Sequence, residues 1–256
     1  MADMRVADFE TSDGINIAVH EMGPMVNSGQ TAILIHGFFS DAQTNWIKYG
    51  HAALLAEAGF RVIMPELRAH GMSDKPHASS FYRKDVLADD QFALLEELGL
   101  TEFDLVGYSL GGRTVARMLA RGCRPRRAII SGMGLNGLTN TGARSAHFAH
   151  ILDNIGQHER GSPEWMAEAF LKTTGGDPIA LRRVIDSFVD TSEDDLRGMR
   201  TPVGVICGED DQDNGSAAQL AGILSAGQLI TIPGNHMSAV AKPELGIAIR
   251  DFLTAV

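Results

Sequence analysis

Short apolar runs alternate with segments of helical periodicity along most of this chain, and this alternation restricts the possible folds most strongly. Eight runs have the composition of β-strands, and they span residues 4–10, 15–21, 31–35, 61–65, 103–107, 127–131, 203–207 and 229–232. Helical periodicity covers 46–58, 81–98, 110–121 and 216–224, and Pro243 opens a last expected helix. Strands that alternate with helices are typical of an α/β protein.

Most of the expected strands are apolar throughout, whereas the first two alternate in polarity. Continuous apolar runs such as 31–35 and 203–207 indicate strands that are covered on both faces of a sheet. The runs 4–10 and 15–21, with Ser12-Asp13-Gly14 between them, predict an antiparallel hairpin at one edge. We therefore expect an eight-stranded, mostly parallel sheet flanked by helices.

The segment 133–200 interrupts the alternation, because it contains helical patterns and no convincing strand. These patterns lie near 145–155, 163–172 and 179–189. A structureless loop of that length is uncommon in a compact domain. We expect a small helical cap at 133–200, inserted after the sixth strand into one discontinuous core domain of residues 1–132 and 201–256. The composition of the Gly-, Asn- and Thr-rich stretch 132–142 suits a hinge or a turn-rich crossing.

Composition limits the class of partner. The 256 residues include 22 Lys and Arg against 32 Asp and Glu, for a formal net charge of −10. This balance argues against nucleic acid or an anionic membrane as a partner. No apolar run approaches the roughly 18 residues of a spanning helix, and no secretion signal is evident. With two cysteines far apart, we expect a cytoplasmic protein that acts on a small molecule with an apolar portion; the sequence does not indicate its oligomeric state.

Gly107-Tyr108-Ser109-Leu110-Gly111 is the strongest chemical motif. It matches G-x-S-x-G and stands between an expected strand and an expected helix. In such a turn the residues that flank the serine must be nearly free of side chain, and the strained serine projects its hydroxyl above the sheet. A serine hydroxyl is a poor nucleophile at neutral pH, so it needs a base that a carboxylate orients.

Both partners are available further along the chain, each just after an expected strand. The run 203–207 continues into Gly208-Glu209-Asp210-Asp211-Gln212-Asp213, and the run 229–232 continues into Pro233-Gly234-Asn235-His236. Open α/β sheets bind ligands outside the carboxyl ends of their strands. We therefore expect Ser109, one of these acids and His236 to converge there.

Four motifs together resemble the α/β-hydrolase superfamily over nearly the whole chain outside the cap. They are His36-Gly37-Phe38, the segment 65–73, the elbow 107–112 and the Asp211/His236 pair. The resemblance implies the α/β-hydrolase fold and a catalytic triad of Ser109, Asp211 and His236, because the acid of matching members stands three residues after the glycine that ends strand seven. It also implies an oxyanion hole made by the backbone N–H groups of Phe38 and Leu110.

The chain departs from the superfamily pattern beside these motifs. Where relatives read Asp-x-Arg-Gly-His-Gly-x-Ser, this chain has Glu66 and Ala69 in the first and fourth places. We expect the loop to be reshaped there, since alanine tolerates positive φ less well than glycine. Asn235 replaces the small residue that commonly precedes the histidine. We expect His36 to support its loop rather than to transfer protons, because His236 fills that role.

Residues near the motifs supply candidates for an apolar substrate pocket. They are Phe39, Tyr108, Met133 and Met237, together with Phe38.

The pair His147/His150 has no third ligand at metal spacing, so we expect no metal; no cofactor is implied either. The basic stretch 121–127 ends the elbow helix, where cations complement the helix dipole, and we expect it at the surface.

These features favour an esterase-like serine hydrolase that cleaves a small carboxylic ester, lactone or thioester through an acyl-enzyme on Ser109. A serine at the elbow argues against the haloalkane dehalogenases and epoxide hydrolases of the superfamily, which use Asp there. Two alternatives stay open. One is a carbon–carbon bond hydrolase for ring-cleavage products; relatives of this kind use the same three residues and a basic residue of the cap that binds a carboxylate. The available cations are Arg113, Arg144, Arg182 and Arg183, and the sequence positions none of them. The other is a ligand receptor or signalling protein on the same fold.

Overall fold

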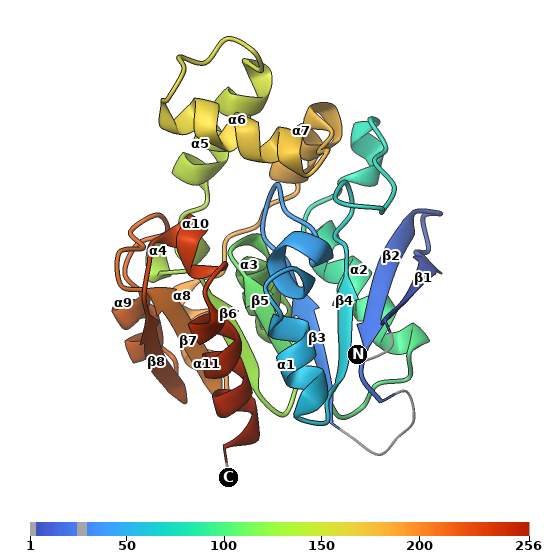
Figure 1. The fold of residues 1–256 in the computed structure, drawn as a ribbon, viewed down its shortest axis with the longest axis vertical. Coiled ribbons are helices and arrows are strands. Elements are labelled where there is room, and N and C mark those ends of the chain that lie inside the picture. Colours follow the sequence, from blue (N-terminus) through green and yellow to red (C-terminus); the bar gives the residue numbers. More distant parts are fainter. Residues whose placement is uncertain (1–3, 25–29, 256) are drawn as a thin grey trace.

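All eight expected strands join one sheet in the computed structural model, which describes residues 4–24 and 30–255 (Figure 1). The strands are β1 (Met4–Glu10), β2 (Asn16–Met22), β3 (Thr31–Ile35), β4 (Arg61–Pro65), β5 (Asp104–Tyr108), β6 (Ala128–Ser131), β7 (Val203–Gly208) and β8 (Gly227–Ile232). Their order is β1-β2-β4-β3-β5-β6-β7-β8. Only β2 pairs antiparallel with its neighbours β1 and β4, so the expected mostly parallel sheet with an edge hairpin is confirmed.

Helices cover both faces of the sheet (Figure 1). They are α1 (His51–Glu57), α2 (Val86–Glu97), α3 (Leu110–Ala120), α9 (Ala217–Ile223), α10 (His236–Ala239) and α11 (Pro243–Thr254). In β3, Ile33 and Ile35 join the apolar cluster beneath α2, α3 and α9, whereas Ala32 and Leu34 join the cluster beneath α1 and α11. Because successive side chains of a strand point to opposite faces, an apolar strand fills two cores at once.

Two helices begin later than their periodicity predicts, because the backbone enters the left-handed region just before them. Gly50, with φ +78°, separates α1 from a short π-helical turn at Gln43–Ile47. Asp85, with φ +64°, precedes α2. None of the helices in the described ranges combines the length and the apolarity that crossing a membrane requires.

The segment between β6 and β7 is helical, as expected. It contains α4 (Leu135–Thr139), α5 (Gly142–Asp153), α6 (Pro163–Thr173), α7 (Pro178–Asp186) and α8 (Glu193–Gly198). Helices α5, α6 and α7 stand above the sheet, whereas α4 and α8 lie beside it and contact α3 and α9 (Figure 1). Helix α4 forms inside the stretch that we expected to be a hinge or a turn-rich crossing. The division into a core and a cap stays a prediction.

Candidate active site

The turn between β5 and α3 holds Ser109 in a strained conformation, with φ +52° and ψ −110°. Glycine is required on both sides of it. A Cβ atom on Gly107 would lie 2.2 Å from the Gly111 carbonyl group, and one on Gly111 would lie 1.9 Å from the carbonyl oxygen of Ile35. The Ser109 N–H donates to the Ser131 carbonyl at 2.8 Å, which ties the turn to β6. The elbow therefore packs α3 directly against the central strands.

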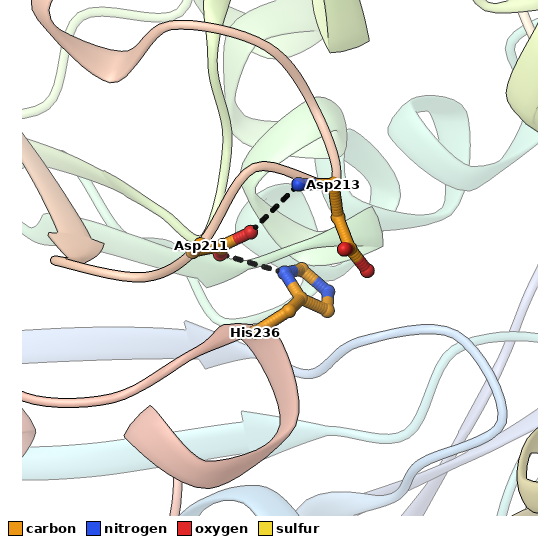
Figure 2. Close-up of side chains that lie close together, drawn as sticks. All are labelled: Asp211, Asp213 and His236. Carbon is orange, nitrogen blue, oxygen red and sulfur yellow. Dashed lines mark hydrogen bonds and ion pairs between the residues drawn. The ribbon is translucent and has the colours of Figure 1, made fainter. Parts of the chain in front are cut away.

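Ser109, His236 and Asp211 form a continuous chain of hydrogen bonds. The Oγ of Ser109 lies 3.0 Å from Nε2 of His236. Nδ1 of His236 lies 2.8 Å from Oδ2 of Asp211, the contact drawn as a dashed line in Figure 2. Asp211 follows β7, and His236 is the first residue of α10 after β8. The structure thus brings together the three residues that the sequence analysis selected, at the carboxyl ends of β5, β7 and β8. Glu209 and Asp210 are exposed instead.

The surroundings of Asp211 favour its ionised form. Burial alone would raise its pKa, but hydrogen bonds from His236 and from the backbone N–H of Asp213 outweigh burial, so the pKa lies below its ordinary value. An ionised Asp211 accepts the Nδ1 proton of His236, which leaves Nε2 free to accept the proton of Ser109. The Tyr108 hydroxyl donates to the His236 carbonyl at 2.6 Å and holds its backbone.

The loop after β3 places the two expected oxyanion donors beside the elbow. For the N–H groups of Phe38 and Leu110, no hydrogen-bond acceptor is found in the described part of the chain. Gly37 comes so close to the elbow that a Cβ atom on it would lie 3.5 Å from the Cβ of Ser109. The oxyanion role of these two N–H groups stays a prediction.

Asn45 was missed by sequence reasoning, yet its Oδ1 accepts the N–H of Gly37 at 2.9 Å. It lies on the π-helical turn and is 2% exposed. Asn45 lies eight residues after Gly37, and no sequence motif marks their contact, because the contact depends on how the π-helical turn folds back on the loop.

Replacing Asn45 with Ala is expected to lower kcat about 10- to 100-fold through a displaced Phe38 donor. It should also lower the free energy of unfolding by about 1–3 kcal/mol, because the N–H of Gly37 loses its acceptor. Steady-state kinetics and urea unfolding measure the two effects. Gln43→Ala, an exposed change on the same turn, is the control. Wild-type kinetics for Asn45→Ala would contradict the assigned role.

His36 supports the same loop, as expected. Its ring is fully buried; Nδ1 lies 2.8 Å from the Gly37 carbonyl, and Nε2 accepts the N–H of Leu67 at 2.9 Å. Burial lowers the pKa of His36, so the ring stays neutral. It has no hydrogen bond to Ser109 or His236 among the described residues.

The structure shows how the two departures in the segment 65–73 are accommodated. Ala69 adopts φ +71°, the left-handed conformation that glycine would take, and its N–H donates to Asp74 at 3.0 Å. This conformation costs a residue with a Cβ atom about 1–2 kcal/mol of strain. Glu66 is buried and accepts the N–H of Met72, and it pairs with His20 at 3.2 Å.

A small cavity of about 20 Å³ lies beside the nucleophile. It is lined by Phe38, Ser109, Leu110, Arg113, Met133, Arg144, Phe148, Phe188 and Asn214. Met133 and Phe38 were expected there. Tyr108 and Phe39 are instead buried next to the site, Phe39 stacked on Phe38 with ring centroids 4.4 Å apart, and Met237 is 54% exposed. None of these three lines the cavity, because Tyr108 bonds the His236 backbone, Phe39 packs on Phe38 and Met237 faces solvent.

Helices above the sheet contact the loop after β3 that carries Phe38 and Phe39, here called the oxyanion loop. Phe148 of α5 packs edge-on against Phe38 and Phe39, with centroid distances of 5.0 and 5.4 Å. The hydroxyl of Thr174, just after α6, donates to the Phe39 carbonyl at 2.7 Å. The segment 133–200 therefore forms part of the cavity wall.

One cluster of potential metal ligands coincides with the site. Donor atoms of Asp211, Asp213 and His236 lie within 4.8 Å of one another (Figure 2). Asp211 already bonds His236 and the N–H of Asp213, so these atoms have an explanation without an ion. The expected absence of a metal stays a prediction.

Comparisons with known proteins relate the chain to the α/β-hydrolase fold. A family model described as the alpha/beta hydrolase fold matches residues 32–133. Epoxide hydrolase 2 of Siraitia grosvenorii is 33% identical over 102 residues, 40% of this chain and 30% of that protein. A putative non-heme chloroperoxidase of Synechocystis is 37% identical over 112 residues, 44% of this chain and 37% of that protein. The matched segments thus span about a third of these relatives' lengths.

The structural likeness extends over the whole chain. An esterase from Exiguobacterium antarcticum superposes with a TM-score of 0.79 and 18% identity, covering 98% of this chain and 100% of the other. At that identity the likeness establishes a shared fold. The expected fold class is thereby confirmed.

Proposed function

We propose that this chain, which has the α/β-hydrolase fold, is a serine hydrolase that cleaves a small carboxylic ester, lactone or thioester. The observation that carries the proposal is the hydrogen-bonded chain from Ser109 through His236 to Asp211 beside a cavity. The esterase of similar fold supports the choice of an ester as substrate class. The elbow hydroxyl supports a covalent acyl intermediate.

In the acylation step, Oγ of Ser109 attacks the carbonyl carbon of the substrate while Nε2 of His236 takes its proton. The carbonyl oxygen becomes an oxyanion that accepts hydrogen bonds from the N–H groups of Phe38 and Leu110. When the tetrahedral intermediate collapses, His236 returns the proton to the leaving alcohol or thiol. Asp211 stabilises the imidazolium that forms in between.

In the deacylation step, water attacks the acyl carbon and gives its proton to His236. The second tetrahedral intermediate uses the same two donors. Its collapse releases the carboxylic acid, and the proton on His236 returns to Oγ of Ser109, so the enzyme ends as it began.

Labelling with a fluorophosphonate probe tests the nucleophile. The wild-type protein should form a stable adduct on the peptide that contains Ser109, detected by mass spectrometry, and should turn over 4-nitrophenyl acetate. Ser109→Ala should lose both properties, because no other hydroxyl is bonded to the imidazole ring of His236 among the described residues. Ser80→Ala, an exposed serine change, is the control. Equal labelling of Ser109→Ala and wild type would refute the proposal.

A further inference from the structure

Arg113 is a buried cation without a partner. It lies on α3, one helical turn after Ser109, and is 6% exposed. Its guanidinium stacks on the ring of Phe188, with Cζ 4.6 Å from the centroid. Within residues 4–24 and 30–255, its Nε and Nη1 atoms have no hydrogen-bond partner, and no carboxylate forms an ion pair with it. Burial lowers the pKa of Arg113 to about 10, so it still carries its charge at neutral pH.

The same protein shows how a structural buried arginine is satisfied. The side chain of Arg68 is fully buried, and it donates two hydrogen bonds to Asp90, at 2.8 and 3.0 Å, and two to Asp13, at 2.8 and 3.0 Å. A buried charge with no such partner is costly to the folded state. The pairing that Arg113 lacks within the chain can be supplied by a ligand.

The location of Arg113 indicates which ligand. It lines the cavity that also holds Ser109, and Arg144 lines the same cavity. Arg144 stacks on Phe148 at 4.7 Å and pairs with Asp213 at 2.8 Å, so its charge is already balanced. Of the two arginines that line this cavity, Arg113 is therefore the one without an ion-pair partner among the described residues. Asp190 and Arg144 are the charged groups that act on it from a distance.

We propose that Arg113 binds a carboxylate group of the substrate, and that the enzyme acts on small carboxylic esters or thioesters that are themselves anionic. This inference rests on the proposed function of Ser109. Ser109 and Arg113 line the same small cavity, so the carboxylate lies close to the scissile carbonyl. An arginine suits this task because its planar donors match a carboxylate.

Two pairs of esters test the proposal and distinguish the acyl side from the alcohol side. Monoethyl glutarate is compared with ethyl pentanoate, and 4-acetoxybenzoate with 4-methylphenyl acetate. In one of the two pairs the carboxylate lies on the side of the ester that Arg113 contacts. For that pair, Arg113→Met should lower the kcat/KM of the anionic ester relative to that of the neutral ester at least about tenfold. Arg113→Lys should restore part of it. Arg250→Met, the same charge change on the exposed face of α11, should leave both ratios unchanged.

Binding supplies a readout that does not need turnover. Monoethyl glutarate and 4-acetoxybenzoate are titrated calorimetrically into Ser109→Ala and into Ser109→Ala/Arg113→Met. Loss of binding in the second protein supports the subsite even if the wild type turns over no ester. The missing turnover would then contradict only the proposed function. Ratios and binding that do not respond to Arg113→Met overturn the subsite, while ester turnover by the wild type leaves the proposed function in place.

Folding of the variant is not expected to confuse the result. Methionine places an apolar chain where an unpaired charge was buried, so the thermal midpoint of Arg113→Met should equal or exceed that of the wild type. A lower anionic preference together with unchanged or higher stability separates recognition from structural support.

Discussion

Asp211→Asn is expected to lower kcat by about 10³- to 10⁴-fold, the size of effect known for this change in serine hydrolases. The amide keeps the shape of the carboxylate but not its charge. His236 then no longer has an anionic acceptor for its Nδ1 proton, 2.8 Å away, and adopts the tautomer that carries the proton on Nε2. In that tautomer it cannot accept the proton of Ser109.

Steady-state kinetics on a neutral ester between pH 6 and 9 measure the effect. Because the pKa of Asp211 is held below its ordinary value, the wild-type carboxylate is ionised throughout this range, and the loss should be seen at every pH. Asp210→Asn makes the same charge change one residue away on an exposed side chain, and its kcat should stay within about twofold of wild type. If Asp210→Asn were the crippled variant, the acid would have to be reassigned.

The sheet and the elbow were predictable because both depend on local sequence rules. A continuously apolar run bounded by turn residues indicates a buried strand wherever it occurs, and all eight strands were found within two residues of their expected ends. Glycines at 107 and 111 indicate a turn too tight for side chains, which the close approach of Ile35 explains. Asp211 required the superfamily pattern as well, since four acids follow β7 within a few residues.

The cavity was less predictable, because its wall comes from segments whose packing no periodicity describes. Phe148 and Phe188 reach the site only because the segment 133–200 folds over the oxyanion loop. Met237 stands next to His236 in sequence, yet α10 directs it to solvent. Arg113 did carry a signal, because it lies only four residues after Ser109, in the first turn of the helix that begins at Leu110. The sequence could not show that Arg113 lacks an ion-pair partner, because that depends on residues distant in the chain.

Gly111→Ala is expected to lower the free energy of unfolding by at least about 3 kcal/mol, more than most core substitutions that add one methyl group. The new Cβ atom would meet the Ile35 carbonyl oxygen at 1.9 Å, and a backbone atom of a central strand cannot turn aside as a side chain can. Relief requires α3 to move away from β3. Urea unfolding with circular dichroism detection gives the midpoint and the slope.

Gly222→Ala is the matched control, because Gly222 also lies in a helix but has open space around its Cα and an ordinary φ. Alanine there should raise stability by up to about 1 kcal/mol, since it removes the entropic cost of a helical glycine. The two changes thus add the same methyl group and should shift the midpoint in opposite directions. Equal midpoints would mean that α3 can move away from β3 without cost. The strained conformation of Ser109 would then need a cause other than the contact between Gly111 and Ile35.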